Sequence, residues 1–262
     1  MPNWVWLGMK AGRAATDWPR RGPDGQEGHL GMPVFDSGHC PPGCAACVAS
    51  CPTGAITAEG SIALDYGRCI VCQRCVEACP EGALTTSDHW AFAVRDRQDL
   101  VRAQSAAADE ERALSRRIAS SLKGSLHIRH VDAGSCNGCE SELQALSNPF
   151  YNLHRLGLFF TPSPRSADLL LVTGPVTPAM RAPLIRTWEA MPEPRMVMAA
   201  GACAVSGALM DQGYASGHGL EGILPVDVWL PGCPPNPAAF IHALLLLLER
   251  APQKVHGGCY EP

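Results

Sequence analysis

The stretch "CIVCQRCVEACP", from Cys69 to Pro80, decides the fold of the first half of the chain. Its cysteines follow the spacing C-x2-C-x2-C-x3-C-P, with ligand candidates at Cys69, Cys72, Cys75 and Cys79. In this pattern three closely spaced thiolates hold one iron–sulfur cube, and the fourth thiolate binds the other cube of a two-cluster domain. The stretch therefore predicts half of a domain built around two 4Fe-4S clusters.

An internal repeat supplies the other half. The segment "CAACVASCPTGAIT", Cys44 to Thr57, matches "CQRCVEACPEGALT", Cys72 to Thr85, which lies 28 residues further on. The first copy departs from the rule, because "CPPGC" places three residues between Cys40 and Cys44 instead of two. Pro-Pro-Gly suits a turn that absorbs the extra residue, so we expect Cys40 to be a ligand as well.

The two copies are expected to exchange their last cysteines. The first set is Cys40, Cys44, Cys47 and Cys79, and the second set is Cys51, Cys69, Cys72 and Cys75. A zinc site is the competing interpretation, but zinc prefers two well-separated C-x2-C pairs with a long spacer. Two dense runs that each end in Cys-Pro favour iron–sulfur clusters in an α+β ferredoxin domain of the bacterial type.

Composition limits the class of protein. The chain has 262 residues, of which 46% are hydrophobic and 18% charged, as expected of a globular protein with a real core. The net charge of -4 gives no reason to expect a nucleic-acid partner. Thirteen cysteines in a long chain whose first residues lack a signal-peptide pattern indicate reduced, metal-bound thiolates, so we expect a cytoplasmic location. Arg20 and Arg21 are followed by "GPDGQEG" rather than an apolar run, which argues against a twin-arginine export signal.

Two apolar segments raise the question of a membrane. The longest apolar run, Ala238 to Leu248, has 11 residues, whereas a membrane span needs about 20. We expect it to form a buried helix. The segment "NWVWLGM" near the N-terminus is expected to pack on a partner rather than on a lipid surface, because few basic residues accompany it.

The chain divides into four predicted parts. An N-terminal extension covers residues 1–30, the two-cluster domain 31–95, a polar helical connector 96–124 and a second domain 125–262. Within the two-cluster domain, "HWAFAVRD" at residues 89–96 is expected to form a short strand. Gly124 is the expected end of the connector.

Strand-like and helix-like segments alternate in the second domain. The predicted strands are Leu126 to Val131, Asp168 to Thr173, Arg195 to Ala200 and Val226 to Leu230. The predicted helices are Glu140 to Ser147, Pro178 to Met191, Ala204 to Met210 and Pro237 to Arg250. Asn236 is the expected N-cap of the last helix, with Pro237 at its first position. This alternation predicts an α/β, flavodoxin-like domain with a doubly wound parallel sheet.

A third set of cysteines follows the ends of these strands. It comprises Cys136 and Cys139 in "SCNGC", Cys203 in "GACAVSG" and Cys233 in "PGCPPNP". The carboxyl ends of parallel strands meet at one edge of the sheet, so the four thiols should converge on a metal site there. Glycines at 134, 138, 201 and 232 are expected to let backbone amides approach it.

Three other interpretations of the third set stay open at this stage. The four residues can be ordinary buried cysteines. Cys136 and Cys139 alone can form a thioredoxin-like redox pair. The nearby glycines can cradle a nucleotide, although no phosphate-loop motif is present.

The same motifs resemble a known family. "CNGCE", "GACAVSG" and "PGCPPNP", with "SPRSADLLLVTGPVTPAMRAP" between them, resemble the small subunit of membrane-associated NiFe hydrogenases of the formate hydrogenlyase and hydrogenase-4 group, over residues 124–250. The part from "MPNWVWLGMKAG" to "VRDRQDLVRA" resembles the polyferredoxin-like subunit of these complexes, so the chain looks like a fusion of two neighbouring subunits. The related complex I subunit carries two adjacent cysteines where this chain has Ser135, Cys136 and Asn137, which favours the hydrogenase.

The resemblance implies a proximal 4Fe-4S cluster on the third set, and hence three clusters in all. It also implies a partner large subunit with the NiFe site, because only Cys259 remains to supply a further thiolate. This chain would then conduct electrons between that site and a further redox subunit or ferredoxin, on the cytoplasmic side of a membrane-bound complex. The alternatives are a complex I-like subunit that passes electrons to quinone, and a non-redox module whose metals only hold the fold.

Other residues carry weaker expectations. Glu140 can join a proton route or a subunit contact, or can simply be a carboxylate at a helix start. Arg181, in "TPAMRAP", is expected to face the large subunit by resemblance. His127 and His130 are expected to be packed rather than to bind metal, and His39 to tune the neighbouring cluster.

Overall fold

The computed structural model describes residues 2–12, 29–58, 62–102, 124–211, 213–251 and 253. It begins with helix α1 (Asn3–Ala11), which buries none of its residues. Trp4 is 75% exposed and Met9 62% exposed, so this apolar helix is free to contact another molecule. Among the described residues, no helix has the length and apolar character that crossing a membrane requires.

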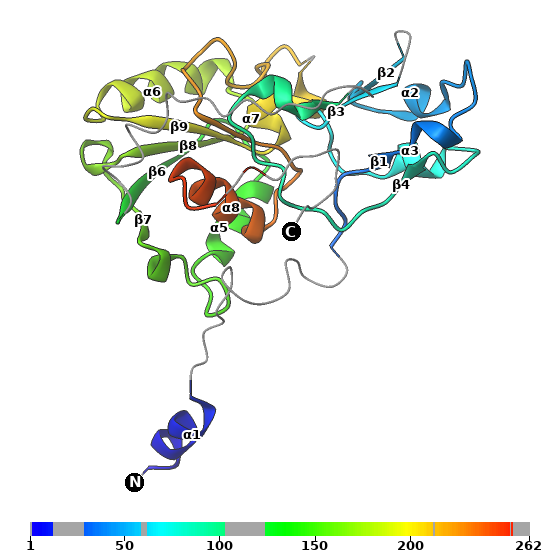
Figure 1. Ribbon diagram of the computed structural model, residues 1–262. Coiled ribbons are helices and arrows are strands. Elements are labelled where there is room, and N and C mark those ends of the chain that lie inside the picture. Colours follow the sequence, from blue (N-terminus) through cyan, green and yellow to red (C-terminus); the bar gives the residue numbers. More distant parts are fainter. Residues whose placement is uncertain are drawn as a thin grey trace.

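The repeat predicted from the sequence is visible in the two-cluster domain. Each copy gives a short helix and then a strand: α2 (Ala46–Ser50) with β2 (Ile56–Thr57), and α3 (Arg74–Glu77) with β4 (Leu84–Thr85). Strand β4 pairs antiparallel with β1 (Val34–Phe35), and β2 pairs antiparallel with β3 (Ala63–Asp65). A 3-10 helix, η1 (Ser37–His39), precedes Cys40. Figure 1 shows this domain beside the larger sheet.

The start of the predicted connector belongs to the same domain. Arg97–Leu100 forms the 3-10 helix η2, and Val101–Arg102 forms strand β5, which adds to β3. These residues are therefore not part of an α-helix. Leu100 is fully buried, and its burial holds η2 and β5 against the rest of the domain. The rest of the predicted connector, residues 103–123, lies outside the described residues.

The strand predicted at 89–96 is wrong. Only Val94 makes a β-bridge, and its antiparallel partner is Trp229 of the second domain. Phe92, Ala93 and Val94 are nevertheless buried. These apolar side chains therefore pack between the two domains instead of forming a strand of the first domain.

The second domain contains a five-stranded parallel sheet. Its strands are β6 (Leu126–Asp132), β7 (Leu158–Phe160), β8 (Leu169–Thr173), β9 (Met196–Ala200) and β10 (Val228–Leu230). Their order across the sheet is β7-β6-β8-β9-β10, and every neighbouring pair is parallel. The four predicted strands are present. The fifth, β7, was not predicted, because it is a three-residue edge strand.

Helices cover both faces of this sheet, as an all-parallel sheet requires. Leu170 and Val172 of β8 pack with α6 (Pro178–Glu189) and α7 (Ala202–Ser206), whereas Leu169 and Leu171 pack on the opposite face with α5 (Gly138–Ala145) and α8 (Pro237–Leu247). Figure 1 shows α6 and α7 on one side and α5 and α8 on the other. Short 3-10 helices, η3 (Leu153–Leu156), η4 (Pro164–Ser166) and η5 (Ala208–Met210), complete the domain.

Helix α8 is the buried helix that its sequence predicts. Every residue from Pro237 to Leu247 is buried. The Asn236 side chain accepts a hydrogen bond from the Ala239 amide at 2.7 Å, and Pro237 occupies the first turn. The N-cap Asn236 lies three residues after Cys233, so this cap also fixes the loop that carries a candidate ligand.

Candidate metal centres

The first set lines one cavity in the two-cluster domain. Cys40, Cys44, Cys47 and Cys79 all border it. Desolvation raises the pKa of Cys40, and the neighbouring thiols of Cys44 and Cys79 raise it further. Cys79 comes from the second repeat, so the fold brings together the crossed combination that the spacing predicts. The extra residue before Cys44 does not keep Cys40 away from the other three.

The second set lines another cavity. Cys51, Cys69, Cys72 and Cys75 border it. Burial raises the pKa of Cys69 to about 12 and that of Cys75 to about 11, and the thiol of Cys51 contributes to both shifts. Thiols that resist ionisation need a nearby cation before they can serve as thiolates, and cluster iron supplies that charge.

Backbone amides already point at sulfurs of the second set. The Ala55 amide donates to Cys51 Sγ at 3.3 Å, and the Val71 amide donates to Cys69 Sγ at 3.4 Å. Thr53 Oγ1 lies 3.7 Å from Cys51 Sγ. Val71 reaches this position with a φ of 58°, an unusual value for a β-branched residue. Hydrogen bonds to ligand sulfur are what tune an iron–sulfur cluster, so the surroundings fit the group.

The third set gathers at the carboxyl edge of the parallel sheet. Burial raises the pKa of Cys139 well above its ordinary value, and Glu140, Cys203, Cys233 and Cys136 raise it further, in that order. Burial, with Cys233, Cys136 and Glu140, raises the pKa of Cys203 to about 11. Cys136 and Cys233 are exposed, whereas Cys139 and Cys203 are half-buried. The set therefore opens onto the surface on one side.

The expected glycines play different parts. A Cβ at Gly201 would lie 2.7 Å from Cys139 Sγ, so a side chain there would meet the sulfur. Gly138 is also close to a thiol, since its Cβ would lie 3.5 Å from Cys136 Sγ. Gly134 and Gly232 instead approach Thr177 and Pro235. These two glycines fit the turns of the ligand loops rather than contacts to sulfur.

Glu140 is held in a polar network behind the third set. Its carboxylate accepts hydrogen bonds from Ser135 Oγ at 2.7 Å and from Thr173 Oγ1. His130 Nε2 lies 2.9 Å from Thr173 Oγ1 and 3.6 Å from the Glu140 carboxylate. Burial lowers the pKa of His130, although Glu140 and Asp132 oppose this. Sequence reasoning gave no role to Thr173, which is buried at the end of β8.

The remaining candidates lie apart from the cysteines or on the surface. His127 is exposed, and its ring stacks on Phe159 with ring centroids 5.8 Å apart. His39 pairs with Asp36 at 2.8 Å on the surface. Arg181 is exposed on α6. Cys259 lies outside the described residues.

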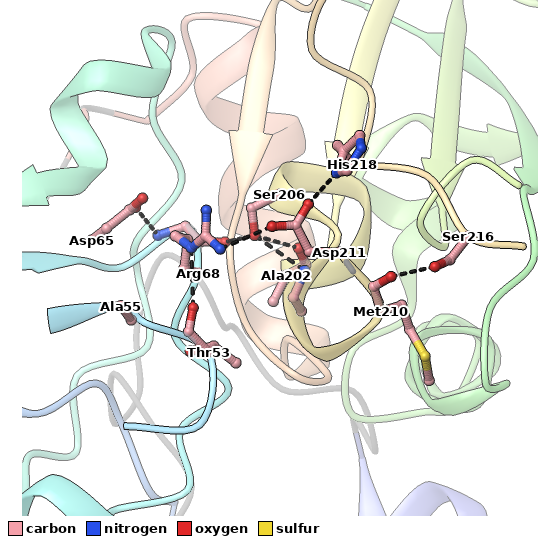
Figure 2. Close-up of polar contacts among 12 residues, drawn as sticks. Thr53, Ala55, Asp65, Arg68, Ala202, Ser206, Met210, Asp211, Ser216 and His218 are labelled. Carbon is pink, nitrogen blue, oxygen red and sulfur yellow. Dashed lines mark hydrogen bonds and ion pairs between the residues drawn. The ribbon is translucent and has the colours of Figure 1, made fainter. Parts of the chain in front are cut away.

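A polar junction joins the loops of the second and third sets. Arg68, which precedes Cys69, donates to the Asp211 carboxylate at 3.0 Å and to the Thr53 carbonyl at 3.1 Å. Ser206, three residues after Cys203, donates to the Gly67 carbonyl at 2.9 Å. Figure 2 shows Arg68 between Thr53 and Asp211, with Ser206 beside them. Sequence reasoning missed this junction, because the partners are more than 130 residues apart.

Among the described residues, no group of three or more His, Cys, Asp or Glu side chains is arranged to hold a single metal ion.

Comparison with known protein families identifies both halves of the chain. A family described as "4Fe-4S dicluster domain" matches residues 39–83, which contain the first and second sets. A family described as "NADH ubiquinone oxidoreductase, 20 Kd subunit" matches residues 136–247, which contain the third set.

Two relatives carry formate hydrogenlyase or hydrogenase names. Formate hydrogenlyase subunit 7 of Escherichia coli is 44% identical over 135 residues, which are 52% of this chain and 53% of that protein. The probable membrane-bound hydrogenase subunit mbhJ of Pyrococcus furiosus is 40% identical over 151 residues, 56% of this chain and 90% of that protein. A chain of the archaeal membrane-bound sulfane sulfur reductase shares 36% identity over 51% of this chain and 73% of its own, with a TM-score of 0.45.

This chain thus spans about half the length of the Escherichia coli relative and nearly all of the Pyrococcus one. The matches confirm the resemblance inferred from the motifs at the third set. The chain belongs to the family of the Pyrococcus furiosus membrane-bound hydrogenase subunit, and it carries a 4Fe-4S dicluster domain ahead of the part that matches the NADH ubiquinone oxidoreductase 20 Kd subunit.

Proposed function

We propose that this chain is the electron-transfer subunit of a NiFe hydrogenase complex. It would carry electrons through three 4Fe-4S clusters to or from a NiFe site on a partner large subunit. The observation that carries the proposal is the gathering of twelve cysteines into three sets of four. Bound clusters supply one-electron chemistry at potentials set by burial and hydrogen bonding.

The protein's own part is to hold and space these groups. The first set would bind one cluster, the second set another and the third set the proximal one. Amides such as those of Ala55 and Val71 would stabilise negative charge on the ligand sulfurs. We further propose that the two-cluster domain ends with β5, and that the second domain is flavodoxin-like, which the strand order supports.

The contacts between domains support an order for the three centres. Arg68 and Gly67, next to Cys69, contact Asp211 and Ser206 near the third set. The second set would therefore be the middle centre. The first set would be the entry or exit toward a redox subunit or ferredoxin.

Exposure supports the position of the large subunit. Cys136 and Cys233 are exposed at the sheet edge, where a partner would cover the proximal cluster. The exposed helix α1 would contact another subunit of the complex, and the membrane subunits of the complex would be indirect partners. We propose that the complex holds this chain on the cytoplasmic side.

Anaerobic purification of the chain with its partners tests the proposal. Three clusters predict about twelve irons per chain, nickel in the large subunit, and hydrogen evolution from a low-potential donor. Zinc with little iron would instead support a structural metal module. Twelve irons without nickel, together with quinone reduction, would favour the complex I-like alternative that the family's description raises.

A further inference from the structure

The junction between the two domains has features that simple packing does not require. Arg68 and Asp211 form an ion pair with side chains 35% and 20% exposed. The same guanidinium holds the Thr53 carbonyl, two residues after Cys51. Arg68 itself directly precedes Cys69, and its side chain binds the loop that follows Cys51. This one residue therefore links the two loops that carry the ligands of the second set.

The opposite side of the junction is equally well anchored. Hydrogen bonding from His218 lowers the pKa of Asp211, and the Arg68 guanidinium lowers it further, so the carboxylate is ionised. The Ser206 hydroxyl, on the helix that carries Cys203, contacts the Gly67 carbonyl at 2.9 Å. Figure 2 shows His218 and Arg68 on either side of Asp211.

The ligand loop is also fixed within its own domain. Asp65 accepts hydrogen bonds from the Gly67 amide at 2.9 Å and from Arg97 at 2.7 Å. A Cβ at Gly67 would lie 2.6 Å from the Arg97 guanidinium, so the turn packs closely on that side chain. The polar contacts across the junction therefore join a ligand loop that is hydrogen-bonded within its own domain to the helix that carries Cys203.

We propose that Arg68, Asp211 and Ser206 are positioning residues that set the distance between the centre of the second set and that of the third. This inference rests on the proposed function, because it assumes a cluster on each set. The step served is the transfer of one electron, in which one centre is oxidised as the other is reduced, with no bond or proton moved. Electron tunnelling falls steeply with distance, so small displacements of the loops change its rate.

The main test compares Asp211→Ala with Glu193→Ala in the full-length, cluster-loaded chain. Glu193 pairs with Arg195 at 3.0 Å and is 75% exposed, so its variant removes a carboxylate from an arginine away from the junction. Three quantities are measured: iron per chain, the spin–spin splitting between neighbouring reduced clusters in EPR, and the intercluster electron-transfer rate after flash photoreduction.

We expect Asp211→Ala to keep its iron, to show weaker splitting and to slow electron transfer between the two centres. Glu193→Ala should leave all three quantities unchanged. The conservative variant Asp211→Glu should restore part of the splitting. Arg68→Met provides the same test from the other side of the junction.

Unchanged splitting and rate in both Asp211→Ala and Arg68→Met would overturn the proposal. Loss of iron in Asp211→Ala would also overturn it, since the ion pair would then retain a cluster rather than set a distance. Absence of the clusters from the unaltered chain would instead remove the proposed function itself. The iron content of that chain reveals this before any variant is made.

Discussion

At the scale of single residues, Gly201 leaves no room for a side chain beside a candidate ligand. Its φ is +89°, and an added Cβ would lie 2.7 Å from Cys139 Sγ. We predict that Gly201→Ala loses the proximal cluster, so that iron falls from about twelve to about eight per chain. Gly222→Ala is the matched control, because Gly222 also has a positive φ but no atom near its Cβ. Equal iron in both variants would contradict the prediction.

Thr53 is a second residue that we expect to influence a centre, through its contact with a ligand sulfur. Its hydroxyl lies 3.7 Å from Cys51 Sγ, and its side chain is buried. Thr53→Val keeps the shape and removes the donor, so the midpoint potential of the second-set cluster should fall. A hydrogen bond worth about 1 kcal/mol corresponds to roughly 40 mV for one electron. Redox titration followed by EPR measures the shift, and a rise in potential would count against the hydrogen bond.

At the scale of elements, the N-cap of α8 makes a measurable contribution to stability. Asn236 accepts a hydrogen bond from the Ala239 amide at 2.7 Å. Asn236→Ala should lower the free energy of unfolding by about 1 kcal/mol, whereas Asn236→Asp keeps the acceptor and should cost much less. Denaturant titration of the cluster-loaded chain distinguishes the two. Equal stability of all three proteins would show that the cap is unimportant.

The individual elements differ in how well the sequence predicts them. Long apolar strands such as β8, and the capped helix α8, follow from local pattern. Strand β7 was missed because three edge residues give no pattern. Residues 89–96 resemble a strand, yet their apolar side chains pack between domains, a tertiary effect that no local window contains.

The candidate centres divide in the same way. Cysteine spacing predicts the first and second sets. The third set is predicted from loops that follow the carboxyl ends of parallel strands, because those ends share one edge of the sheet. The Arg68–Asp211 pair and the Thr173–Glu140 contact depend on residues far apart in the chain. Only the folded arrangement shows that they meet.

At the scale of the whole molecule, the two repeats exchange their last cysteines. This exchange gives a prediction that differs from that of two repeats which each bind their own cluster. Cys79 lies with Cys40 and Cys44 rather than with its own repeat. Cys79→Ser should therefore alter the EPR signal of the first-set cluster, and Cys51→Ser that of the second. To assign each EPR signal to a cluster, each of these substitutions is combined with a substitution of a second cysteine from the same proposed set. The opposite assignment would show that the repeats bind their clusters independently.

The most direct measurement for the whole account is an iron anomalous-difference map of the anaerobically purified complex. The account predicts three four-iron cubes per chain, with the middle one on the second set and the last at the sheet edge between Cys136 and Cys233. Zinc at any of these positions, or a map without iron at that edge, would contradict it.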